Sequence, residues 1–159
     1  MKLSNKQISK IRERYKLSKR ELDFIKLFFE GVNDNLELSQ RLNIAFLTAK
    51  LHVTNIYKKL GVNNKLKVVI KIIDECKLLD FDIKNPPKSL LLNIQEKYNF
   101  TPREMDLIKL LFKGITVNKE LSKNMGILLT SAALYLVSVY RKTYTNNKLA
   151  LIINFIDEN

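Results

Sequence analysis

The sequence predicts an all-α protein made of two copies of one helical unit. Three observations lead to this prediction. The 159 residues match themselves after a shift of 83 positions, apolar residues recur at helical spacing, and no segment alternates apolar and polar residues as a strand does. We therefore expect one domain at residues 1–78, a linker at 79–88 and a second domain at 89–159.

The internal repeat needs no gap. Residues 20–27 align with 103–110, residues 63–66 align with 146–149, and about 28 of 66 aligned positions are identical. Between the two copies lies Asn85-Pro86-Pro87, and two successive prolines disfavour a helix. The prolines therefore mark the linker.

Capping signals and apolar spacing predict the helices of the first copy. Ser4-x-x-Gln7 and Ser18-x-x-Glu21 are capping boxes, and each is followed by apolar residues at three-to-four spacing. Gly31 follows the second of these helices and is expected in the left-handed conformation. Further helices are expected over residues 36–42, 46–60 and 65–78.

The second copy repeats this order. Thr101-x-x-Glu104 is a capping box with Pro102 at the first helical position, where the missing N–H costs nothing. Gly114 takes the place of Gly31 at the end of that helix.

Composition excludes several classes of protein. Cys76 and His52 are the single cysteine and histidine, so neither a disulfide scaffold nor a Cys/His zinc site is expected. No apolar run is long enough for a membrane span, and the N-terminus does not read as a signal peptide. With 4 glycines and no nucleophile–base pair, no catalytic residue, metal or cofactor is predicted. We expect a non-enzymatic protein of a reducing compartment, the cytoplasm.

The net charge of +12 favours a polyanionic partner, and nucleic acid comes first. The excess is spread, with about +7 in residues 1–83 and about +5 in residues 84–159. A solvated, lysine-rich surface is the alternative interpretation.

The order of helices and motifs resembles the LuxR-type (GerE-type) helix-turn-helix of bacterial transcription regulators. The resemblance covers residues 15–76 and 98–159, and it is carried by these stretches: Leu17–Glu21, Gly31, Thr48–His52 and Asn55–Val62 in the first copy, and Phe100–Glu104 and Asn118–Ser122 in the second. It implies two helix-turn-helix domains of four to five helices each.

The resemblance also implies a partner and a surface. In the family, the third core helix enters the DNA major groove and the fourth packs in a symmetric dimer. Double-stranded DNA is thus the expected partner, with these expected contacts: Thr48, Lys50, Leu51, Thr54, Lys58, Lys59, Arg141 and Lys142. The expected seam, within one chain or between two chains, comprises Val69, Ile72, Ile73, Ile152, Phe155 and Ile156.

The two copies depart from the family pattern to different degrees. In the first, Ala45 and Phe46 replace polar residues at the start of the third helix, and Leu51 offers a groove-facing apolar side chain that suits a thymine methyl or a protein. In the second, Ala133 and Tyr135 replace the motif's lysine and histidine, and residues 129–140 carry no charge. We expect the first copy to dominate DNA contact and the third helix of the second copy to be buried or to form an interface.

Two functions remain open on these residues. One is a DNA-binding transcription regulator whose tandem domains act as a built-in pseudo-dimer. The other is a degenerate helix-turn-helix protein that binds another protein through its apolar third helices. Among single residues, we interpret His52 as packed or phosphate-contacting, Cys76 as a core or interface thiol, and Glu21 and Glu104 as capping residues only.

Overall fold

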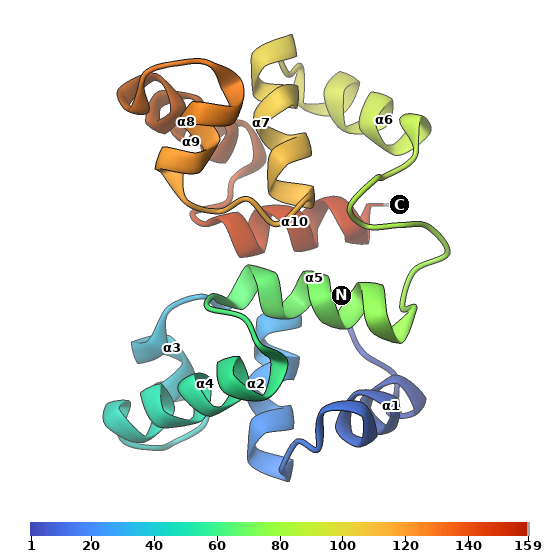
Figure 1. Cartoon of the computed structure of the whole chain (residues 1–159), viewed down its shortest axis with the longest axis vertical. Coiled ribbons are helices and arrows are strands. Elements are labelled where there is room, and N and C mark those ends of the chain that lie inside the picture. Colours follow the sequence, from blue (N-terminus) through green and yellow to red (C-terminus); the bar gives the residue numbers. More distant parts are fainter. Residues whose placement is uncertain (159) are drawn as a thin grey trace. The chain divides into compact units, whose positions relative to one another are not determined.

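The computed structural model describes residues 1–158, which form ten α-helices and contain no strand. The chain divides into two compact units, the first from Met1 to Leu78 and the second from Leu79 onward. Each unit contains five short helices, which Figure 1 shows clustered together within the unit.

The first unit holds α1 (Asn5–Tyr15), α2 (Lys19–Phe29), α3 (Asn35–Arg41), α4 (Phe46–Leu60) and α5 (Lys65–Cys76). Both expected capping boxes are present, because the Ser4 and Ser18 hydroxyls accept from the amides of Gln7 and Glu21. The expectation for α5 was two residues too long. Lys77 adopts a left-handed conformation with φ of 50°, which ends the helix at Cys76.

The second unit holds α6 (Lys88–Tyr98), α7 (Pro102–Phe112), α8 (Asn118–Met125), α9 (Leu129–Thr143) and α10 (Lys148–Asp157). Each of these helices begins 83 residues after its counterpart in the first unit. Pro87 caps α6, so Lys88, which the sequence assigned to the linker, is already helical. Residues 79–87 contain no helix, and Ile83 among them is buried.

Each unit has its own apolar core. In the first, the buried faces of the helices meet over Ile11, Phe24, Phe28, Phe29 and Ile56, all 0% exposed. In the second, Phe155 of α10 lies among aromatic rings, with centroids 5.8 Å from Tyr98, 6.2 Å from Phe100 and 6.3 Å from Phe112. These contacts hold the helices of each unit as a single body.

The loop between α2 and α3 is fixed at both ends. Gly31 has φ of 86°, a left-handed value that favours glycine, and its counterpart Gly114 has φ of 81°. Lys65 at the start of α5 then donates from Nζ to the Asn33 carbonyl and to Asn35 Oδ1, each at 2.7 Å. Burial lowers the pKa of Lys65, an effect that the charge of Asp34 opposes. This lysine holds the start of α3 against α5.

Candidate nucleic-acid interface

The helix-turn-helix of the first unit consists of α3 and α4, joined by the turn at residues 42–45. One side of α4 buries Ala49, Val53, Ile56 and Leu60, which recur every three or four residues and pack the helix on α2 and α3. The opposite side of α4 is therefore exposed along its whole length.

The expected DNA-contacting residues of α4 lie on this exposed side. Thr48, Lys50, Leu51, Thr54 and Lys58 are all exposed, and α4 contains no acidic residue. Within residues 1–158, Lys50 and Lys58 form no ion pair, and the Lys50 ammonium lies 5.7 Å from the Phe46 ring centroid. The Thr54 hydroxyl donates to the Lys50 carbonyl at 2.9 Å, which leaves its oxygen able to accept. The exposed part of α4 thus offers cations, the hydroxyls of two threonines and the apolar side chains of Phe46, Leu47 and Leu51.

The start of α4 also suits an anion. Ala45 occupies the N-cap position and provides no side-chain acceptor for the amides of the first turn. Unpaired amides and the helix dipole together favour negative charge at a helix N-terminus. Thr48 lies on this first turn and adds an exposed hydroxyl.

Lys59 makes contacts within its own unit, and its expected DNA contact stays a prediction. Its ammonium lies 2.7 Å from Glu21 Oε2 and 3.0 Å from the Lys16 carbonyl, so it is held inside the unit. Glu21 is 3% exposed, and the same Oε2 accepts from the Ser18 amide at 2.7 Å. The interpretation of Glu21 as a capping residue only was therefore wrong, because it also anchors the last turn of α4 to the first turn of α2.

The second unit repeats this anchor. Lys142 donates from Nζ to Glu104 Oε2 and to the Asn99 carbonyl, each at 2.8 Å. Glu104 Oε1 additionally accepts from the Ser138 hydroxyl at 2.7 Å. Glu104 is therefore also more than a capping residue, and Arg141 is left as the exposed cation at the end of α9.

The anchor predicts a stability effect at Lys59. Burial opposes ionisation of Glu21, but the hydrogen bonds from Lys59 and Ser18 outweigh it and hold the pKa of Glu21 below its ordinary value. Lys59→Met leaves the buried carboxylate without its cation and should lower the free energy of unfolding by about 1–3 kcal/mol. We place the effect in this range because the lysine side chain is 37% exposed.

Urea unfolding at several pH values checks this prediction. A carboxylate with a lowered pKa in the folded state stabilises the protein at neutral pH, and that contribution is lost as the pH falls through the folded pKa. The natural chain should therefore lose stability below about pH 4.5 more steeply than Lys59→Met. Equal stability of the two chains at neutral pH would contradict the assigned role.

Apolar side chains are exposed on α9, where the sequence predicted burial or an interface. Leu128 is 74%, Leu129 53%, Leu134 70% and Val137 55% exposed. They lie between the N-cap residue Leu128 and Val137 on the third turn of α9, and no charged residue lies between them. On α4, Leu51 at 65% exposed is the counterpart of Leu134. The burial alternative for α9 was therefore wrong, and the interface alternative stays a prediction.

The remaining singled-out residues are packed. The His52 ring lies 5.3 Å from that of Phe24, and Cys76 is buried, which raises the pKa of its thiol. The expected seam residues are also buried: Val69, Ile72, Ile73, Ile152, Phe155 and Ile156. Phe155 among them belongs to the aromatic core of its own unit.

Acidic, cysteine and histidine side chains form no metal-binding group in the part of the chain that the structure describes. Across residues 1–158, no helix combines the length and the apolar character that a membrane span requires.

Positive charge is concentrated in the unit that carries the basic α4. In residues 1–78, 17 Lys and Arg oppose 8 Asp and Glu, whereas from residue 79 onward 11 oppose 8. The first unit therefore accounts for +9 of the net charge of +12. The boundary at residue 78 divides the charge less evenly than the boundary at residue 83, because Asp80 and Asp82 then belong to the second unit.

A short helix, a tight turn and a second helix with an exposed basic side are the elements of a DNA-binding helix-turn-helix domain. In the first unit these elements are α3, residues 42–45 and α4. Residues 15–72 match the family of bacterial regulatory proteins of the luxR type (GerE), so the first unit contains one LuxR-type helix-turn-helix domain. The match confirms the resemblance expected for the first copy.

The chain is also similar to a curated protein, the "Probable transcriptional regulator ycf29" of Cyanophora paradoxa. The two are 24% identical over 107 residues, which cover 65% of this chain and 50% of the relative. The chain thus spans about half the length of that protein. No solved structure matches the chain. Together the domain and the relative support a DNA-binding regulator.

Proposed function

We propose that this chain is a DNA-binding transcriptional regulator with two tandem LuxR-type helix-turn-helix repeats, of which the first is the main DNA reader. The observation that carries the proposal is the exposed side of α4. It presents Lys50, Thr54 and Lys58 with no acidic residue on the helix, within the domain that matches the LuxR family. Such a helix fits the major groove.

The tandem organisation is supported by sequence and by helix positions. About 28 of 66 aligned residues are identical, and each helix of the second unit begins 83 residues after its counterpart. The second repeat is degenerate as a reader, because Ala133 replaces Lys50 and Tyr135 replaces His52.

Within α4 the side chains have distinct proposed roles. Thr48, Lys50 and Leu51 contact base edges, since polar groups and a methyl-accepting apolar side chain are what the major groove can distinguish. Thr54 and Lys58, further along the helix, contact phosphates. Lys59 and Lys142 act indirectly by anchoring their helices, and Arg141 provides a weaker phosphate contact in the second repeat.

A binding assay with genomic fragments from the organism that encodes the chain tests the proposal. Enrichment of particular fragments is expected, and Lys50→Ala should weaken binding to them by about 1–3 kcal/mol if the lysine touches a base. If it touches a phosphate, the salt slope should fall by about 1. Loss of binding on Arg141→Ala, with no effect of Lys50→Ala, would reverse the roles of the repeats.

The fourth helices of the repeats, α5 and α10, are the proposed seam. Their apolar residues include Val69, Ile72 and Ile73 in α5 and Ile152 and Ile156 in α10. A seam between the two repeats of one chain would set two recognition helices about one DNA turn apart, roughly 34 Å. A seam between two chains is the alternative arrangement.

Sedimentation of the natural chain and of Ile156→Lys tests the seam. A dimer that the substitution dissociates supports the seam between chains. A monomer that unfolds with Lys at this position supports the seam within one chain, because charge buried in an apolar contact is costly. A natural monomer that tolerates the substitution without loss of stability contradicts both arrangements.

The second candidate function is a protein-interaction module, and the exposed apolar side of α9 favours it. Leu134→Lys should abolish association with a protein partner while leaving DNA binding unchanged, because a charge at the centre of an apolar contact remains without compensation. Association that does not respond to salt favours this candidate, whereas steep salt dependence favours DNA.

A further inference from the structure

The C-terminal end of α1 carries two cations that the fold does not use. Of the basic residues on this helix, Lys10 donates to the Cys76 carbonyl and Arg14 forms an ion pair with Glu75 at 3.0 Å. Arg12 and Lys16, by contrast, are exposed and form no ion pair within residues 1–158. The match to the LuxR family begins only at residue 15, so α1 precedes almost all of it.

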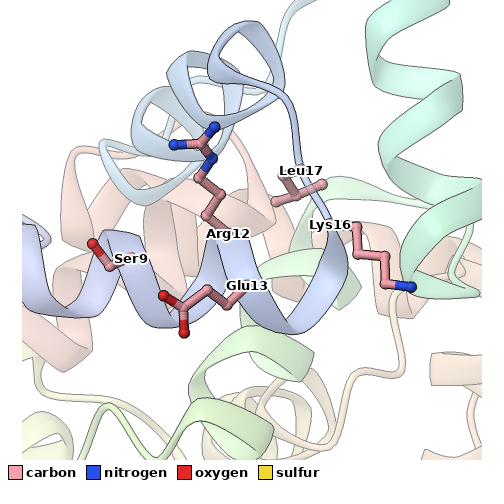
Figure 2. Close-up of a pocket in the computed structure, with 5 residues that line it drawn as sticks. All are labelled: Ser9, Arg12, Glu13, Lys16 and Leu17. Atoms are coloured by element: carbon pink, nitrogen blue, oxygen red, sulfur yellow. The ribbon is translucent and has the colours of Figure 1, made fainter.

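These two cations line a shallow hollow of about 380 Å³ with Ser9, Glu13 and Leu17 (Figure 2). Figure 2 shows the Arg12 guanidinium and the Glu13 carboxylate pointing to different sides, and the Lys16 side chain extending away from both. Arg12 and Lys16 outnumber Glu13, so the hollow carries a net positive charge, and neither cation forms an ion pair with Glu13 or with any other residue among 1–158.

The hollow lies next to the C-terminal end of α4, the proposed DNA-reading helix. The Lys59 ammonium of α4 reaches the Lys16 carbonyl at 3.0 Å, so the end of α1 is held against the last turn of α4. Lys58 is exposed on the same turn. When a helix lies in the major groove, the groups beside its ends face the phosphates that border the groove.

The second unit shows that the fold does not require these charges. The residues 83 positions after Arg12 and Lys16 are Gln95 and Asn99, and α6 ends there in the same way as α1. Lys16 has φ of 49° and Asn99 has φ of 48°, so the two backbones share the left-handed conformation. Asparagine tolerates this conformation better than lysine does, hence stability does not explain a lysine at position 16.

We propose that Arg12 and Lys16 form a second contact with the DNA backbone, beyond the contacts made by α4, and that this contact is specific to the first repeat. The inference rests on the proposed function and adds α1 to the DNA-binding surface. Duplex phosphates are the ligand of this contact, because two cations without ion-pair partners adjoin the end of a basic helix that has no acidic residue.

Fluorescence anisotropy with duplex DNA over a series of salt concentrations tests this contact. The variant Arg12→Gln/Lys16→Asn installs the residues that the second repeat already accommodates, so its circular dichroism and unfolding midpoint should not fall. Each lost phosphate contact reduces the slope of log Kobs against log salt concentration by about 0.9. The double variant should therefore lower the slope by about 2, and equally for selected and mixed-sequence duplexes.

The matched control is Lys2→Gln/Lys6→Gln, which removes the same charge from the first turn of α1 and from the segment that precedes it. A rise of 1.5 Å per residue places Lys6 about 15 Å from Lys16 along α1. The control charges therefore lie away from the proposed phosphate contact, and their removal should change the salt slope by much less. The inference would be overturned if Arg12→Gln/Lys16→Asn had the same salt slope as the natural chain, or if the slope fell equally in the control. Either result would leave the proposed function of the chain standing. If the natural chain shows no salt-dependent binding to duplex DNA, the proposed function itself fails.

Discussion

Replacing Lys50 with Glu is expected to weaken binding to duplex DNA by about 100-fold, or roughly 2.7 kcal/mol. Lys50 is exposed in the N-terminal half of α4, on a helix that contains no acidic residue. The substitution removes one cation contact, worth about 1–3 kcal/mol if it reaches a base, and it places a carboxylate against phosphates. Stability should not change, because Lys50 forms no ion pair among residues 1–158.

Ala133→Glu is the matched control, since Ala133 stands 83 residues after Lys50 in the second repeat. Titration of labelled duplex with both variants measures the difference between the repeats. Only a small loss of affinity is expected for Ala133→Glu. An equal loss in the two variants would contradict a dominant first repeat, and a larger loss for Ala133→Glu would assign DNA reading to the second.

The second large effect concerns stability. Phe29→Ala removes a ring that is 0% exposed in the core of the first unit and should cost about 3–5 kcal/mol. Phe112, its counterpart in the second unit, is also 0% exposed and should cost a similar amount when replaced by Ala. Each substitution should act mainly on its own unit, because each unit has a separate core.

Hydrogen exchange followed along the chain checks this expectation. Phe29→Ala should raise amide exchange chiefly in residues 1–78, and Phe112→Ala chiefly beyond residue 78. Uniform loss of protection along the chain in both variants would show a single cooperative unit and would contradict two separate cores.

Local signals in the sequence were sufficient to predict the helices. The capping boxes at Ser4, Ser18 and Thr101 and the left-handed glycines Gly31 and Gly114 all occur as predicted. The end of α5 could not be predicted, because residues 77 and 78 are a lysine and a leucine with no capping signal. In the structure the helix ends because Lys77 adopts the left-handed conformation, and its backbone N–H donates to the Asp74 and Ile73 carbonyls.

The outer side of α4 could also be predicted, because exposure follows from helical spacing around Ala49, Val53 and Ile56. The anchoring role of Lys59 could not, since it depends on a contact between residues 38 positions apart in sequence. One signal was available: Glu21 and Lys59 recur as Glu104 and Lys142, whereas exposed positions of α4 such as Lys50 differ between the copies. Paired residues that persist while their neighbours change indicate a contact within the fold.

The salt dependence of DNA binding tests the central claim most directly. The natural chain should bind duplex DNA with a log–log slope of about −3 or steeper, because Lys58, Arg12 and Lys16 provide three cationic phosphate contacts. Lys50→Glu should bind far more weakly at every salt concentration, with its fold unchanged. Absence of binding to any duplex at low salt, or affinity that does not change with salt, would contradict DNA recognition by the first repeat.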